Sequence, residues 1–450
     1  MPGRSPGAPK LTGPVGSTAL YAGAVVVTAL CVAICIALPV VTIALSGVLI
    51  VLIAVIYWGP VRVGNAFMII AVFTGPMMRV RPLYPVLTFV SASDLAVLIA
   101  VALLAPTMLS RRVRLPKHFL LAWVLLVSGG VLGSLVNHVQ IATSVSYIIR
   151  FVIAGLFLPL VFFMWRPTIR QVRLGAGAYV AGQIVSTAYG LLEGPRDNHR
   201  YFGLTTHALF FGPAGVLATG CGLYLLGRAK TTRQRVVLII SLAICLWSVV
   251  MSGSRASLLT AVAVYVIFAI THRSLITIWW LVAGAGAFAI SFQQLVASSS
   301  QGSAITRLAG NNTTAYADER RTGAFIEALH DFAHHPFTGK GWITILDYHN
   351  VPLEMLVGGG ILGLIGYLFL IYPMIRRTFD IDIEGGLSLI PIAWLITSLT
   401  VPRLWDRIIW IGLALALAGL TAHTEPMAEE RAATATPEGS PERSPVLLAP

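Results

Sequence analysis

Charged side chains are scarce in this sequence: Asp, Glu, Lys and Arg make up 11% of its 450 residues, whereas 56% are hydrophobic. The mean hydropathy is +0.82. A soluble domain could not bury that much apolar surface, so this composition excludes an ordinary soluble protein. We therefore expect the chain to have the lipid bilayer as its solvent.

Cysteine is also scarce. The four cysteines, at positions 31, 35, 221 and 245, all fall inside apolar segments, and none has the spacing of metal ligands in a loop. We expect them to pack as small hydrophobic side chains.

Apolar runs near the 20 or so residues that a helix needs to cross the hydrocarbon recur along almost the whole chain. They predict an all-α fold: a polytopic transmembrane helical bundle of about 12–14 spans, with one long extracytoplasmic loop that contains short helices. The expected organisation is a cytoplasmic N-terminal tail over 1–18, transmembrane helices 1–11 over 19–293, the extracytoplasmic loop over 294–350, transmembrane helices 12–14 over 351–422, and a disordered cytoplasmic tail over 423–450. Fourteen spans are expected at 19–38, 40–58, 63–78, 86–105, 118–136, 145–164, 174–192, 207–227, 236–252, 256–271, 274–293, 351–373, 387–402 and 408–422.

The formal net charge is +13, which in a soluble chain would suggest nucleic acid. Here the basic residues gather in short loops between apolar runs, and the positive-inside rule places those loops and both termini in the cytoplasm. Because membrane topology accounts for these basic residues, we expect no nucleic-acid partner. The same count of spans places 196–207, 252–255 and 294–350 on the outer face. The cytoplasmic loops are those with Arg111, Arg112, Arg114 and Lys117; Arg166, Arg170 and Arg173; Arg228, Lys230, Arg233 and Arg235; and Arg376 and Arg377.

Four polar patterns stand at the ends of expected spans or in the long outer loop. They are Arg200-Tyr-Phe-Gly203-Leu-Thr-Thr-His207; Ser252-Gly-Ser254-Arg255-Ala-Ser257; Arg321 followed by His335-Pro-Phe-Thr-Gly339-Lys340-Gly341; and His349-Asn350 followed by Gly360-Ile-Leu-Gly363. Their order around one large outer loop resembles that of the O-antigen ligase and O-antigen polymerase superfamily. The resemblance covers roughly residues 190–372, and the earlier helices are similar only in being hydrophobic.

The resemblance implies a membrane glycosyltransferase, a lipid-linked glycan ligase, polymerase or oligosaccharyltransferase. The donor would be a polyprenyl-diphosphate-linked glycan, and the acceptor a hydroxyl of a glycan, lipid or protein. The protein would be multi-pass in the bacterial cytoplasmic (inner) membrane, among membrane lipids, with its active site on the extracytoplasmic side. Ligase and polymerase differ only in the acceptor, and the sequence does not separate them.

The residues fit the chemistry of such a donor. The planar guanidinium of arginine stays charged and pairs bidentately with phosphate oxygens, and histidine can accept a proton from the acceptor hydroxyl near neutral pH. Metal and cofactor are dispensable for this chemistry, and we expect neither. The serines of 252–257 lack a nucleophile elbow, so we do not expect covalent catalysis. We predict catalytic roles for His349, Arg255 and Arg200, and substrate-binding roles for Arg321, Arg150, Ser254, Asn350 and Lys340.

Two further expectations concern single segments. After His349-Asn350, members of this superfamily often have an acidic residue shortly before the glycine of the next helix, whereas this chain has Gly358-Gly359 there and Glu354 as its nearest carboxylate. The loop segment from Asp318 to Phe332 has helical spacing, whereas 298–312 is rich in Ser, Gly and Asn and is expected to be irregular.

Arg150 lies inside an expected span, where a charge at the centre of the bilayer costs about 2.5–3.5 kcal/mol on insertion scales. We expect it to face the bundle interior, with Asp94 as a conceivable partner, or else to extend toward the outer surface. A buried arginine also suits the alternative function, a transporter or flippase for a lipid-linked glycan or a small anion. Against transport stands the position of the candidate polar residues, which gather on the outer face and not at the midplane.

Overall fold

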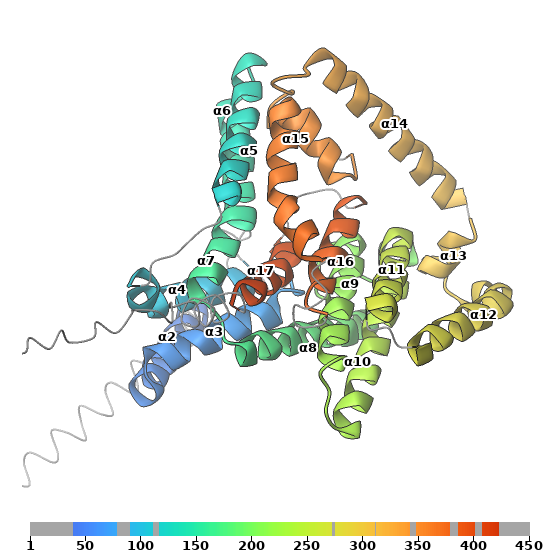
Figure 1. The fold of residues 1–450 in the computed structure, drawn as a ribbon, viewed down its shortest axis with the longest axis horizontal. Helices are drawn as coiled ribbons and strands as arrows, with labels where there is room; N and C mark the ends of the chain where they lie inside the picture. The colour runs from blue at the N-terminus through green and yellow to red at the C-terminus, as the bar shows by residue number, and fades with distance from the viewer. Residues whose placement is uncertain are drawn as a thin grey trace, which may run out of the picture.

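The chain folds into helices connected by short loops, with no strand in the part that the computed structural model describes (Figure 1). The described residues are 39–78, 91–110, 117–271, 275–310, 312–342, 348–378, 386–400 and 407–422. The helices are α2 (Pro39–Trp58), α3 (Pro60–Thr74), α4 (Ala92–Leu109), α5 (Lys117–Val136), α6 (Ile141–Phe151), the π-helix η2 (Val152–Phe157), α7 (Leu158–Trp165), α8 (Ile169–Glu193), the short 3₁₀ helix η3 (Asp197–His199), α9 (Ala208–Leu226), α10 (Thr232–Met251), α11 (Arg255–Thr271), α12 (Leu275–Ser298), α13 (Ala304–Leu308), α14 (Asn312–His334), α15 (Val351–Thr378), α16 (Leu389–Ser398) and α17 (Arg407–Ala422).

The fold is a transmembrane helical bundle, as the sequence predicts. Among the described residues, six helices are long and apolar enough to cross a membrane. They are Ala92–Leu109, His118–Val136, Tyr147–Trp165, Ala208–Leu226, Thr232–Met251 and Val351–Tyr372. Five shorter apolar helices accompany them. The total of about 12–14 spans stays a prediction, because the expected span 19–38 lies outside the described residues.

The bundle is organised around α9, whose side chains are almost all buried. It packs between α8, α10, α11 and α16, and glycines on its surface allow this close approach. A Cβ at Gly215 would lie 2.6 Å from Ser248 Oγ of α10. Cys221 and Cys245 are buried and unoxidised in this core, as expected of small hydrophobic side chains. Cys31 and Cys35 lie outside the described residues.

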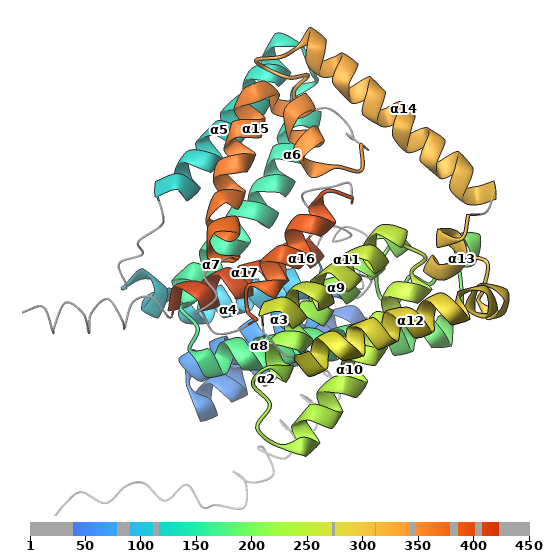
Figure 2. The ribbon, with the colours of Figure 1, turned by 45° about the vertical axis from the view of Figure 1, so that its right-hand side comes forward.

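The outer segment differs from expectation in two places. The part expected to be irregular contains a short helix, α13, whose first turn is capped by Ser303 through a bond from Thr306 N at 3.1 Å. The expected helix from Asp318 to Phe332 is confirmed but longer, because α14 runs over 23 residues. Figures 1 and 2 show α14 as one long diagonal helix from α13 toward the turn that precedes α15.

The glycines of the third and fourth patterns meet at a kink in α15. Gly360 has φ +62° and ψ −156°, which breaks the helix and frees backbone groups on both sides of it. The turn after α14 fills these positions: Lys340 N donates to Val357 O at 2.7 Å, Gly341 N to Gly358 O at 3.0 Å, and Ile361 N to Pro336 O at 2.9 Å. Glycine alone adopts the conformation of Gly360 readily. The glycines of these patterns therefore allow the backbone of the turn after α14 to pack directly against the backbone of α15.

Replacement of Gly360 by alanine tests this junction. An added Cβ would lie 2.3 Å from Phe337 O, in a conformation that L-residues rarely adopt. We expect Gly360→Ala to lower the free energy of unfolding by about 2 kcal/mol or more, measured as a lower melting temperature of the detergent-purified chain. Gly286→Ala in α12, where nothing lies within 4 Å of the added Cβ, should leave the melting temperature unchanged. Equal melting of both variants would contradict the prediction.

Candidate functional site

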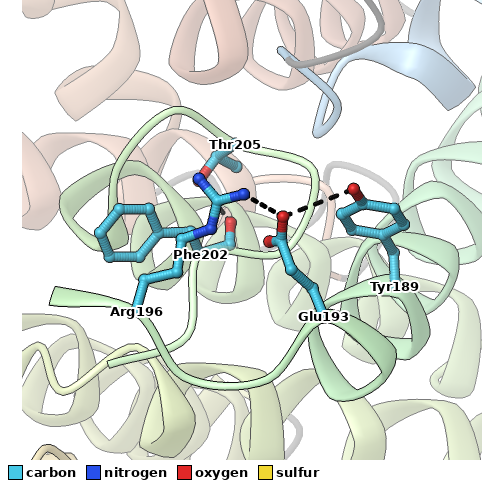
Figure 3. Close-up of polar contacts among 5 residues, drawn as sticks. All are labelled: Tyr189, Glu193, Arg196, Phe202 and Thr205. Carbon is cyan, nitrogen blue, oxygen red and sulfur yellow. Dashed lines mark hydrogen bonds and ion pairs between the residues drawn. The ribbon is translucent and has the colours of Figure 1, made fainter. Parts of the chain in front are cut away.

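The loop that carries Arg200 is held at its start by an acidic residue. Glu193, the last residue of α8, lies between Arg196, with which it forms an ion pair, and Tyr189, whose hydroxyl donates to Glu193 Oε1 at 3.5 Å (Figure 3). Further along, Thr205 Oγ1 donates to Phe202 O at 2.6 Å. These contacts fold the chain back between α8 and α9, so that Arg200 points toward the end of α10.

Arg200 is 9% exposed, which is unusual for a loop arginine. Its Nε donates to Ser252 O at 2.7 Å, whereas its Nη2 is buried and has no hydrogen-bond partner among the described residues. Burial, followed by the positive charges of Arg307 and Arg321, lowers the pKa of Arg200 to about 9. The guanidinium still carries its charge at neutral pH, and a bound anion would oppose this shift, because an opposite charge nearby favours the charged form.

The segment from Ser252 to Arg255 forms the turn between α10 and α11. Gly253 has φ +67°, and a Cβ there would lie 2.2 Å from Gly302 O and 2.8 Å from Arg200 Nε. Ser254 caps α11, because its Oγ accepts from Ser257 N at 3.2 Å and from Ser257 Oγ at 2.8 Å. The hydroxyl of Ser254 is thus engaged in the cap, while Arg255, the first residue of α11, reaches outward and forms an ion pair with Asp318 of α14.

A fourth arginine, Arg307, completes the cluster, and the sequence analysis missed it. Its Nη1 donates to Gly253 O at 2.7 Å from the last turn of α13. No motif surrounds Arg307 in the sequence, and only the unexpected helix α13 brings it to the turn at Gly253. The one local signal in the sequence was Ser303, a residue type that caps helices, four positions before Arg307.

We call Arg200, Arg255, Arg307 and Arg321 the arginine cluster. Burial and the charges of other members lower the pKa values of Arg200, Arg307 and Arg321. Among the described residues, Asp318 is the carboxylate whose charge acts on Arg307 and Arg321, and the arginines lower its pKa in turn, chiefly through its bond with Arg255. Four positive charges therefore face one negative charge, and this excess of positive charge would attract an anion.

A second polar group lies at the far end of α14. Asp331, almost buried, accepts the hydroxyl of Tyr348 at 3.0 Å and forms an ion pair with Lys340 at 2.5 Å. Burial, then the bond to Asp331, raises the pKa of Tyr348. Lys340, predicted to bind substrate, is therefore held by Asp331 at this end of α14, away from the arginine cluster. We call Asp331, Lys340 and Tyr348 the distal cluster.

His349 and Asn350 form the entry to α15. His349 has φ +53°, a left-handed conformation that is uncommon for a residue other than glycine. Asn350 caps the helix, since its Oδ1 accepts from Leu353 N at 3.1 Å, and its Nδ2 donates to Leu399 O at 3.4 Å beyond α16. Glu354, the carboxylate nearest to Gly358-Gly359 in the sequence, is buried one turn into α15.

The two clusters are separated along α14. Asp318 and Asp331 are thirteen residues apart on this helix, which corresponds to about 20 Å along its axis. We expected Arg200, Arg255 and His349 to meet at one point. The structure brings Arg200, Arg255 and Arg321 together around Asp318. His349 lies between Tyr348, whose hydroxyl bonds Asp331, and Asn350, which bonds Leu399, and its approach to the arginines stays a prediction.

The remaining predicted residue, Arg150, lies near the end of α6, directly before the π-helix η2. The structure describes its backbone and not its side chain. Asp94, considered as its partner, lies in the first turn of α4, where Oδ2 accepts from Ser91 N at 2.7 Å. The span that contains Asp94 was expected to begin at residue 86, six residues before α4 begins. The pairing of Asp94 with Arg150 stays a prediction.

No family model matches this chain, and no curated protein matches it either. The resemblance to the O-antigen ligase and polymerase superfamily therefore stays a prediction.

Proposed function

We propose that this chain is a membrane glycosyltransferase. It would transfer a glycan from a polyprenyl diphosphate carrier to an acceptor hydroxyl, on the face of the membrane opposite the basic loops. The observation that carries the proposal is the arginine cluster, in which four guanidinium groups from four segments meet with one carboxylate.

A diphosphate fits the cluster better than a single phosphate or a carboxylate. A diphosphate linked at both ends carries about two negative charges, and each phosphate can accept a bidentate guanidinium. The buried Nη2 of Arg200 supplies a donor with no partner among the described residues, and such a group is costly unless a ligand satisfies it. In a transfer reaction, the same donors would stabilise the charge that develops on the departing carrier.

The surroundings of Arg255 favour a carrier with a lipid tail. Leu259, Val262 and Val266 follow Arg255 at helical spacing on one side of α11, and all three are exposed. A diphosphate held at the start of α11 would therefore continue into an apolar stripe along the same helix. In a protein with membrane-spanning helices, this stripe allows the polyprenyl chain to remain in the bilayer while its head group is bound.

His349 is the proposed general base that deprotonates the acceptor hydroxyl. Figures 1 and 2 show the first part of α15, which His349 precedes, between the rest of α15 and α14. A base must come within hydrogen-bond reach of the hydroxyl, so the acceptor must bind between His349 and a donor held by the arginine cluster. The acceptor oxygen would attack the anomeric carbon of the donor glycan as His349 takes the hydroxyl proton. The bond between that carbon and the diphosphate oxygen breaks, and the diphosphate leaves on its carrier.

Arginine substitutions test the phosphate site. Each of Arg255→Ala and Arg321→Ala should weaken binding of a polyprenyl-diphosphate glycan about 10- to 100-fold, because each removes charge-assisted hydrogen bonds worth about 1.5–3 kcal/mol. Binding is measured by titration of the purified chain in nanodiscs. The matched control is Arg320→Ala, since Arg320 is exposed on the same helix, and it should bind as the wild type does. Unchanged affinity in both cluster variants would reject the site.

Substitution of the base should separate transfer from binding. We expect His349→Ala to lose at least about 100-fold in the transfer rate, the typical contribution of a positioned general base, while its donor affinity stays that of the wild type. Transfer is followed with a defined polyprenyl-diphosphate glycan and an acceptor, with and without a chelator. Full transfer by His349→Ala would exclude the base role, and inhibition by the chelator would exclude the metal-free reaction.

A further inference from the structure

Asp318 occupies an unusual position for an acidic residue. It lies on α14 in the middle of the arginine cluster, paired with Arg255, and its side chain is 50% exposed. Arg255, Arg321 and Arg307 all act on it and hold its pKa below the usual range of an aspartate. The carboxylate is therefore ionised whenever the cluster is charged.

A carboxylate bound to a guanidinium uses the same donors that a phosphate oxygen would use. Asp318 forms its ion pair with Arg255, and it lies on α14, outside the turn at Gly253 whose carbonyls bond Arg200 and Arg307. Of the cluster's ionic contacts, the pair of Arg255 and Asp318 is thus the one that an incoming phosphate would replace.

We propose that Asp318 is a resident counter-anion that competes with the diphosphate for Arg255 and thereby sets the affinity of the site. This inference rests on the proposed function only in the identity of the diphosphate. Asp318 is a positioning and specificity residue: it touches Arg255 and forms no bond with the reacting atoms.

The competition has a consequence for turnover. After transfer, the carrier diphosphate is linked at one end only, and its free terminal phosphate ionises a second time with a pKa near 6, so the product carries about three negative charges. A cluster of four unopposed arginines would hold this product more tightly than the donor. Asp318 reduces the excess of positive charge and can return to Arg255 as the product leaves, which favours release.

A purely structural role makes the opposite prediction. If Asp318 served only to fasten α14 to α11, its loss would loosen the cluster and weaken anion binding. If it competes with the anion, its loss strengthens binding. The sign of the change in affinity therefore decides between the two roles.

The experiment measures binding of inorganic diphosphate to the full-length chain in nanodiscs by calorimetry, at one fixed ionic strength because salt screens these charges. We expect Asp318→Asn to bind diphosphate about three- to tenfold more tightly than the wild type, since one competing charge at a partly exposed ion pair is removed. Asp318→Ser, which keeps no amide in the place of the carboxylate, should show the same gain and serves if Asp318→Asn fails to fold.

Glu319 provides the matched control, because it is exposed, adjacent on α14, and not among the charges that shift the pKa values of Arg200, Arg307 and Arg321. Glu319→Gln should bind as the wild type does, which excludes a general effect of net charge. In an Arg255→Gln background, Asp318→Asn should give no gain, because the competed guanidinium is absent. Unchanged or weaker binding by both Asp318 variants overturns the proposal. If the wild type binds diphosphate, Arg255→Gln does not, and Asp318→Asn shows no gain, the phosphate site stands and only the competition by Asp318 is overturned. Absence of binding in every form overturns the phosphate site as well.

Discussion

The mutual repulsion of four guanidinium groups is the constraint on which the proposed chemistry depends. Like charges at this proximity oppose folding, and burial of Arg200 adds a desolvation cost. Hydrogen bonds to backbone carbonyls oppose this repulsion and desolvation cost: Ser252 O accepts from Arg200, and Gly253 O accepts from Arg307. Carbonyls satisfy hydrogens without neutralising charge, so the cluster keeps its attraction for an anion while its geometry is fixed.

Much of the fold could be predicted from the sequence, because bilayer spans are encoded by composition over about 20 residues. The expected spans at 40–58, 118–136 and 207–227 coincide with α2, α5 and α9 to within a residue or two. The errors lie where local polarity misleads. The Ser/Gly/Asn-rich part of the outer segment was expected to be irregular, yet Ser303 is a helix cap there, and caps and loops use the same residue types.

The site was predictable only in part, and the reason is topological. Arg200 and Arg255 stood in patterns at the ends of expected spans and Arg321 in the expected loop, and alternation of the spans placed them on one side. Arg307 had no such signal. Helical periodicity over Asp318 to Phe332 indicated a helix without fixing where its two ends would lie, so it could not predict that Asp331 bonds Tyr348 far from Asp318.

The two ends of α14 are attached to the rest of the bundle in different ways. Ala328, near the distal end of α14, packs against Leu353 and Val357 in the first part of α15, directly before the kink at Gly360. At the other end, the ion pair of Asp318 and Arg255 holds α14 to α11. The first attachment is apolar and indifferent to charge, whereas the second is an ion pair that an anion can exchange. A ligand that binds the arginines would therefore act on one end of α14, while the end near Ala328 remains packed against α15.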